Sequence, residues 1–172
     1  MIVSGLAGCD PAAGGIRPPV RDSAADKVAR MPTEPNILNV VAVYNPYTPW
    51  LWTEDKARAR GIYIGGLYLI GPNWQGVFGD GVIKPRLYVM ERQPDGTKAP
   101  VLVKEWSFGV EEVLPFRGKM RSKLGWGYGL PLDWGDLNLG GREIRVVVAF
   151  EGSDAQIVTS AKKDLIVPPG SS

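Results

Sequence analysis

The sequence predicts an all-β protein, an antiparallel β-sandwich of immunoglobulin-like or C2-like type with about seven to eight strands. Short β-branched or alternating stretches recur along the chain, and turn-forming residues separate them. At 172 residues, with 44% hydrophobic and 22% charged side chains, the composition is that of one globular domain. The predicted strands cover residues 37–44, 61–70, 82–92, 101–108, 127–132, 141–151, 155–160 and 165–167.

The first two strands differ in character. Residues 37–44 are mostly β-branched and end at Asn45-Pro46, which favours a turn. Residues 61–70 alternate and then break at Gly65-Gly66, a pattern that suits two short strands or one strand with a bulge. Between these strands, the mixed polar segment 54–59 is compatible with a short helix.

The later strands are defined by turns and by alternation. Pro85 lacks an N–H group, so we expect the start of 82–92 to lie at a sheet edge. Pro94-Asp95-Gly96 predicts a hairpin turn, because proline presets one φ angle and Asp-Gly accepts a positive one. In 141–151 the buried face is predicted from four alternating residues, Ile144, Val146, Val148 and Phe150.

The domain organisation follows from composition. Residues 1–9 are interpreted as the remnant of a lipoprotein signal, and residues 10–36 as a flexible linker rich in proline and alanine. Within the linker, residues 24–31 can form a transient helical turn that Pro32 ends. The folded domain is expected over 37–167, followed by a disordered tail over 168–172.

Composition also excludes whole classes of chemistry. The chain has no histidine and one cysteine, which rules out imidazole-based triads and thiolate zinc sites within this sequence. We therefore expect no enzyme activity, no cofactor and no metal. The net charge of +2 gives no reason to expect a nucleic-acid partner, and we expect a monomer.

Leu6-Ala7-Gly8-Cys9 resembles the lipobox of bacterial lipoproteins. In that family the cysteine thiol carries diacylglycerol, the preceding peptide is removed, and the new N-terminus is usually acylated. The resemblance implies a palmitate-type lipid on Cys9 and a lipid-anchored, periplasmic or surface-facing location in the cell envelope. Only residues 1–5, without Lys or Arg, precede the lipobox. The sequence thus leaves open a longer leader upstream or a chance match.

A second resemblance lies in the domain. Trp106-Ser107-Phe108, the run from Gly125 to Leu132 and the closing alternating strand look like an uncharacterised family of β-sandwich lipoproteins from planctomycete-type bacteria. The shared motifs are packing motifs, so the resemblance implies a fold and an envelope location and assigns no catalytic residue.

Aromatic residues are the candidate binding groups. Flat rings cover the apolar faces of sugars, whereas the alternative interpretation is that these rings fill a core without disulfides. The candidate ligand-stacking residues are Trp50, Trp52, Trp74, Trp126, Tyr128 and Trp134.

Other patterns have simpler explanations. The glycines of 125–129 are flanked by β-like sequence, which favours tight strand packing over a phosphate loop. Asp133, Asp136 and Asn138 only weakly resemble a calcium loop, and pairing Glu111-Glu112 with Asp133 as acid and base lacks support from spacing. The basic run 117–123 is expected to be a solvated loop, with anionic lipid headgroups as an alternative partner.

The sequence therefore predicts a non-enzymatic envelope lipoprotein with a structural or interaction role. Its expected partners are the membrane, through Cys9, and an unknown envelope protein or glycan. A glycan-binding module is the alternative function, and a carboxylate-dependent hydrolase is a third.

Overall fold

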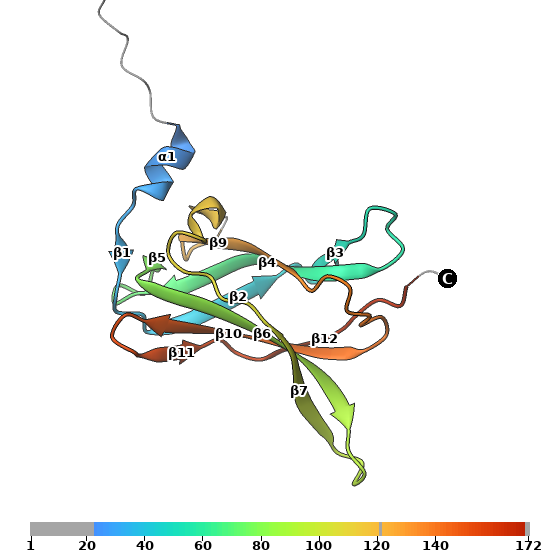
Figure 1. Ribbon diagram of the computed structural model, residues 1–172. Helices are drawn as coiled ribbons and strands as arrows, with labels where there is room; N and C mark the ends of the chain where they lie inside the picture. The colour runs from blue at the N-terminus through green and yellow to red at the C-terminus, as the bar shows by residue number, and fades with distance from the viewer. Residues whose placement is uncertain (1–22, 121, 171–172) are drawn as a thin grey trace, which may run out of the picture.

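The computed structural model describes residues 23–120 and 122–170, and two β-sheets make up most of it (Figure 1). The seven-stranded sheet contains β1 (Thr33–Glu34), β2 (Asn39–Tyr44), β3 (Trp50–Trp52), β4 (Ala59–Ile70), β5 (Gly76–Gly79), β8 (Arg117–Lys119) and β9 (Trp126–Asp133). The five-stranded sheet contains β6 (Gly81–Arg92), β7 (Lys98–Glu105), β10 (Glu143–Gly152), β11 (Ile157–Thr159) and β12 (Lys163–Ile166). The helices are α1 (Ala24–Ala29) and the 3-10 helix η1 (Leu114–Phe116).

The seven-stranded sheet is built around β4. Strands β2 and β3 pair with one edge of β4, and β5 and β9 pair with the other. Strand β8 extends the sheet from β9, and β1 extends it from β5. The β1–β5 pair is parallel, so this sheet is mixed where the sequence predicts antiparallel pairing throughout.

The predicted edge position of Pro85 is wrong. Strand β6 lies between β10 and β7, so Pro85 is in an interior strand, not at an edge. The ladder is interrupted beside it: Ile83 pairs with Phe108, whereas regular β6–β7 pairing begins only at Arg86. Trp106 N donates to Pro85 O (3.0 Å) across this gap. Because the β6–β7 ladder is interrupted here, a residue without an N–H group can occupy this position in an interior strand.

Both sheets contribute to one hydrophobic core. The predicted buried face of β10 is confirmed, and it packs with Ile62, Ile64, Leu67 and Leu69 of β4 and with Leu87 and Val89 of β6. Strand β4 is continuous through Gly65-Gly66, and its register shifts on both edges there. This confirms the prediction of one strand with a bulge rather than two short strands. The hairpin turn is also confirmed, with Gly96 at φ +84°.

The described part of the predicted linker, residues 23–36, contains helix α1, at the expected helical turn, and strand β1. Ser23 and Asp26 form a capping box at the start of α1, and β1 joins the sheet, so ordered structure begins before Ile37. Arg117 Nη1 donates to the carbonyls of Ala29 and Met31 (3.2 Å each). Arg117 is thus a half-buried residue of β8 and not part of a solvated loop.

Residues 54–59 do not form the predicted helix. Thr53 N donates to Arg58 O (3.0 Å), which closes a turn, and Lys56 in this turn has φ +57°. The sequence also fails to predict the short strands β1, β3, β5 and β8.

Candidate functional site

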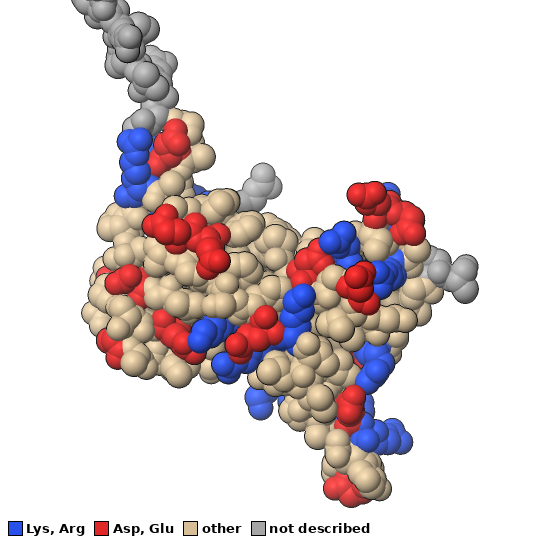
Figure 2. Space-filling model, viewed as in Figure 1, with Lys and Arg blue, Asp and Glu red and all other residues tan. Residues whose placement is uncertain are grey.

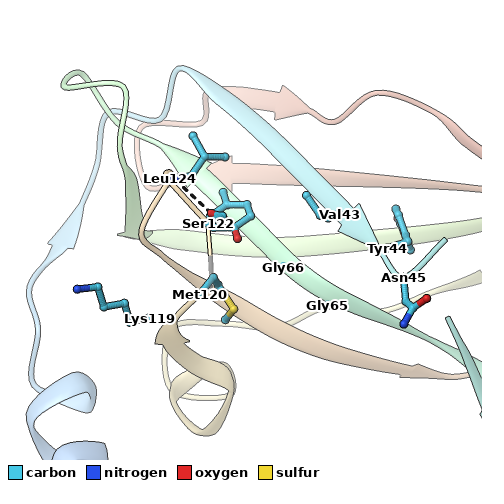
Figure 3. Close-up of a pocket in the computed structure, with 10 residues that line it drawn as sticks. Val43, Tyr44, Asn45, Gly65, Gly66, Lys119, Met120, Ser122 and Leu124 are labelled. Atoms are coloured by element: carbon cyan, nitrogen blue, oxygen red, sulfur yellow. Dashed lines mark hydrogen bonds between the residues drawn. The ribbon is translucent and has the colours of Figure 1, made fainter. Parts of the chain in front are cut away.

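A groove of about 480 Å³ lies over the middle of β4, on the face of the seven-stranded sheet that points away from the core (Figure 3). A site of this volume falls in the range of small-ligand pockets. Its lining consists of Val43, Tyr44, Asn45, Gly65, Gly66, Tyr68, Lys119, Met120, Ser122 and Leu124.

The bulge at Gly65 creates the groove. Against β2, Gly66 pairs with Val43 and Ile64 pairs with Tyr44, so Gly65 is the extra residue. Against β9, the register also shifts between Ile64 and Leu67. Glycine has no side chain to stand above the bulged backbone, and Gly65 is exposed. The floor of the groove is therefore bare backbone.

Tyr68 forms one wall. A Cβ at Gly66 would lie 2.9 Å from Tyr68 Cε2, and a Cβ at Gly127 would lie 3.1 Å from Tyr68 Cδ1. These two glycines let the ring lie close against the sheet, where its exposed fraction is 3%. Lys119, Met120, Ser122 and Leu124 line the groove as well, and Figure 3 shows Met120 and Ser122 on one side of the glycines with Val43 and Asn45 on the other.

Few polar groups line the groove. Asn45 Oδ1 accepts hydrogen bonds from the backbone N–H groups of Tyr47 (2.9 Å) and Thr48 (3.1 Å), which leaves the amide NH2 as a donor. Ser122 Oγ accepts from Leu124 N (3.2 Å), so its hydroxyl hydrogen is available to a ligand. Lys119 is exposed and points away from Gly65 and Gly66 (Figure 3).

Tyr44 lines the groove from β2 while its ring packs against the core. Its hydroxyl is buried and finds no hydrogen-bond partner within the described part of the chain. Burial raises the pKa of Tyr44 well above its ordinary value. This phenol stays neutral at physiological pH, so it is suited to neither base nor nucleophile chemistry.

The predicted aromatic residues do not form one stacking platform. Trp134 and Tyr128 have exposed fractions of 1% and 0%, and Tyr128 Oη accepts from Gly79 N (3.0 Å). The prediction that these two stack on a ligand is wrong, because their rings fill the core. Trp126 is half-buried with its ring 6.0 Å from that of Phe78, and Trp50 packs against the core.

Trp52 and Trp74 are the exposed members of the predicted set. They lie at opposite ends of β4, because β3 pairs with its first residues and the turn that carries Trp74 follows its last. The two rings therefore cannot share one small ligand.

The candidate carboxylates do not converge as an acid–base pair. Asp133 binds Arg60, and Asp136 binds Arg58 (3.3 Å). Burial raises the pKa of Asp133, but the hydrogen bonds from Arg60 and Gly135 N, with the charge of Arg60, lower it overall. Glu112 Oε2 accepts from Gly109 N (2.6 Å), and Glu111 is exposed.

Other charges pair across neighbouring strands. Figure 2 shows acidic and basic side chains side by side in a band over β6, where Lys84 binds Glu151 (2.6 Å) and Arg86 binds Glu105. Within residues 23–120 and 122–170, no group of three or more Cys, Asp or Glu side chains could hold a metal ion. In the weak calcium-loop candidate, Asn138 Oδ1 accepts from Gly140 N.

The glycines of 125–129 lie in and next to β9, not at the start of a helix. A Cβ at Gly127 would lie 2.6 Å from Leu67 O, which confirms the tight-packing interpretation. The sequence prediction did not include Tyr63 and Tyr68. The signal for both was their position on either side of Gly65-Gly66, where the bulge leaves room for rings on the outer face.

Comparison of this chain with protein families, with curated proteins and with solved structures gives no match. Among the described residues, no helix has the length and apolar character needed to cross a bilayer. The lipobox residues Leu6, Ala7, Gly8 and Cys9 lie outside the described residues.

Proposed function

We propose that this protein is a non-enzymatic lipoprotein of a bacterial cell envelope, whose domain binds a ligand in the groove over Gly65 and Gly66. The domain is a β-sandwich of immunoglobulin-like or C2-like type in this proposal, as in the planctomycete-type lipoproteins that the sequence resembles. The groove itself is the observation that carries the binding role.

The composition of the groove favours binding over catalysis. Its lining is mostly apolar, with the side chains of Val43, Met120 and Leu124, and it has hydrogen-bond donors at Asn45 and Ser122. A lining that is mostly apolar with a few placed polar groups is typical of ligand sites. The carboxylates lie elsewhere, in ion pairs or at the exposed surface, which argues against the hydrolase alternative.

The envelope location rests on Cys9. We expect a palmitate analogue to label the full chain in its native host, expressed from the upstream in-frame codon, and the label to disappear in Cys9→Ala. Label that persists in Cys9→Ala, or no label in either chain, would remove the anchor from this proposal.

Gly65→Leu tests the groove directly. A Cβ at Gly65 meets only Val43 O, at 3.7 Å, so a leucine there fills the groove without a clash in the core. Gly109→Leu is the matched control, because its Cβ would meet only Glu112 Oε2, at 3.5 Å. With envelope extract fractions immobilised as ligands, Gly65→Leu should lose binding and Gly109→Leu should retain it. Equal binding by both variants would place the ligand site elsewhere.

Tyr63 favours a glycan as the ligand class. Its hydroxyl end lies over Gly129 on the same outer face, and its exposed fraction is 42%. A flat, accessible ring near a groove with amide and hydroxyl donors suits a sugar. Soluble glycans from the envelope should bind the wild type and bind Tyr63→Ala at least tenfold more weakly. Unchanged glycan affinity in Tyr63→Ala, with binding of peptides instead, would favour a protein ligand.

A further inference from the structure

Trp74 occupies a position that the fold gives no reason to reserve for tryptophan. It lies in the turn between β4 and β5, which Gly71 and Gln75 close by a backbone hydrogen bond (3.0 Å). Its φ angle is +57°, a left-handed conformation that bulky residues rarely adopt. The side chain is 69% exposed, and Trp74 is not among the described residues that pack against the core. Strain and exposure together indicate a functional residue.

A second large apolar side chain lies at the same end of the sheet. Asn39 pairs with Ile70, and Leu38 N donates to Ile70 O (2.8 Å), so Leu38 lies across from the start of the turn that carries Trp74. Half of the Leu38 side chain is exposed. The end of the seven-stranded sheet therefore presents two apolar groups to its surroundings.

Basic side chains border this end. Gly76 N donates to Leu124 O (2.7 Å), and Gly76 pairs with Gly125, which joins the 119–125 segment to the turn of Trp74. That segment carries Lys119 and Lys123, both exposed. Neither lysine takes part in an ion pair with another described residue. We call Leu38, Trp74, Lys119 and Lys123 together the Trp74 surface.

The chain enters the domain at this same end. Helix α1 contacts β8, and Figure 1 shows α1 and the β4–β5 turn at one end of the molecule. Thirteen residues separate Cys9 from Ser23, the first described residue. Backbone geometry limits their span to about 50 Å. A lipid on Cys9 would keep Ser23, on the side of the domain that carries the Trp74 surface, within that distance of a bilayer.

We propose that the Trp74 surface contacts the headgroup region of an anionic bilayer and acts as a second membrane signal beside the lipid on Cys9. This inference rests on the proposed envelope location. Tryptophan is favoured at membrane interfaces, where its ring meets both apolar and polar groups. Lysines near an anionic surface each strengthen binding by about fivefold. The acyl chains on Cys9 would supply the anchor, so the role of this contact is to hold the Trp74 end of the domain against the bilayer.

Vesicle binding by the full chain carrying Cys9→Ser tests the surface without an acyl chain. We expect this chain to float with vesicles that contain one-third phosphatidylglycerol and not with pure phosphatidylcholine vesicles. Adding Trp74→Asn should weaken partitioning by about tenfold, because the apolar ring is lost. Adding Lys123→Glu should weaken it by at least about fivefold.

Two matched variants control for general effects. Tyr47→Asn removes another highly exposed ring, in the loop beyond the far end of β2. Lys162→Glu reverses an exposed charge between β11 and β12. Neither should change partitioning. Asparagine accepts a positive φ angle more readily than tryptophan, so Trp74→Asn should unfold at the same or a higher denaturant concentration.

The outcomes separate this inference from the proposed function. No flotation, equal flotation with neutral vesicles, or equal losses in the controls would overturn the bilayer contact. A Trp74→Asn chain that unfolds at a lower denaturant concentration would assign Trp74 to folding and also overturn it. Palmitate labelling of Cys9 without vesicle binding would support the lipid anchor and overturn the bilayer contact. Vesicle binding without labelling would overturn the lipid anchor and support the bilayer contact.

Discussion

The guanidinium carbon of Arg117 lies 4.6 Å from the centre of the Phe78 ring, which places a cation over an aromatic face beside the core. The same side chain holds the carbonyls of Ala29 and Met31. Its Nε and Nη2 are buried and have no hydrogen-bond partner within the described residues. Arg117 therefore connects the N-terminal segment to the seven-stranded sheet, in addition to the pairing of β1 with β5.

We expect Arg117→Met to lower the free energy of unfolding by about 1–3 kcal/mol, because the cation–π contact and two hydrogen bonds are lost. Amide hydrogen exchange in residues 24–34 should rise by more than exchange in β10. Lys119→Met, two residues along the same strand, removes an exposed charge and should change stability by less than about 0.5 kcal/mol. Equal exchange profiles in both variants would show that α1 and β1 are held by other contacts.

Two tyrosines with buried hydroxyls provide a matched pair. Tyr128 Oη accepts from Gly79 N, whereas the Tyr44 hydroxyl has no partner among the described residues. Tyr128→Phe leaves a buried N–H unpaired and should cost about 1–3 kcal/mol. Tyr44→Phe removes an unpaired buried hydroxyl and should be neutral or stabilising. Chemical denaturation of both variants measures the difference, and equal losses would mean that ordered water satisfies Tyr44.

The fold was predictable from sequence where strands are long and patterned. Every second residue from Ile144 to Phe150 is a large apolar one, and β10 (Glu143–Gly152) forms there because that period of two buries one face. The strands β1 and β5 have two and four residues, and their own sequences carry no such period. Strand β1 forms against β5, more than forty positions further along the chain, a relationship that local patterns do not encode, whereas β5 also pairs with the end of β4 across a short turn.

The site was predictable only in part. The break at Gly65-Gly66 indicated a bulge, but the groove also needs residues near 43–45 and 119–124, which only the folded sheet brings together. Exposure of the aromatic residues was not predictable, because it depends on tertiary packing. Trp134 follows a strand and fills the core, whereas Trp74 sits in a turn and is exposed, and residue type alone does not separate the two.

Stability should fall in alkaline solution in a way that depends on Tyr44. Burial raises the pKa of Tyr44 in the folded state, whereas an unfolded tyrosine titrates near pH 10. The contribution of the neutral Tyr44 hydroxyl to the free energy of unfolding is complete below about pH 10. It is lost as pH rises toward the folded pKa, because the unfolded chain releases the proton first. Between about pH 10 and 12, the free energy of unfolding should fall less steeply with pH for Tyr44→Phe than for the wild type. The difference between the two slopes should be about 1.4 kcal/mol per pH unit. Parallel curves from denaturation at each pH would contradict the burial of this hydroxyl.

Gly127, which lies under the Tyr68 ring, and Gly65, which lines the groove, should respond in opposite ways to alanine. A Cβ at Gly127 would lie 2.6 Å from Leu67 O, a backbone atom that cannot move without disturbing β4, so Gly127→Ala should cost about 1–3 kcal/mol. A Cβ at Gly65 would meet only Val43 O, at 3.7 Å, and alanine restricts the unfolded chain. Gly65→Ala should therefore change stability by less than about 0.5 kcal/mol or raise it slightly. Thermal and denaturant unfolding of the two variants give the comparison. A large loss in Gly65→Ala would mean that the bulge requires a backbone conformation that only glycine adopts, and the groove would then be a consequence of strain in β4.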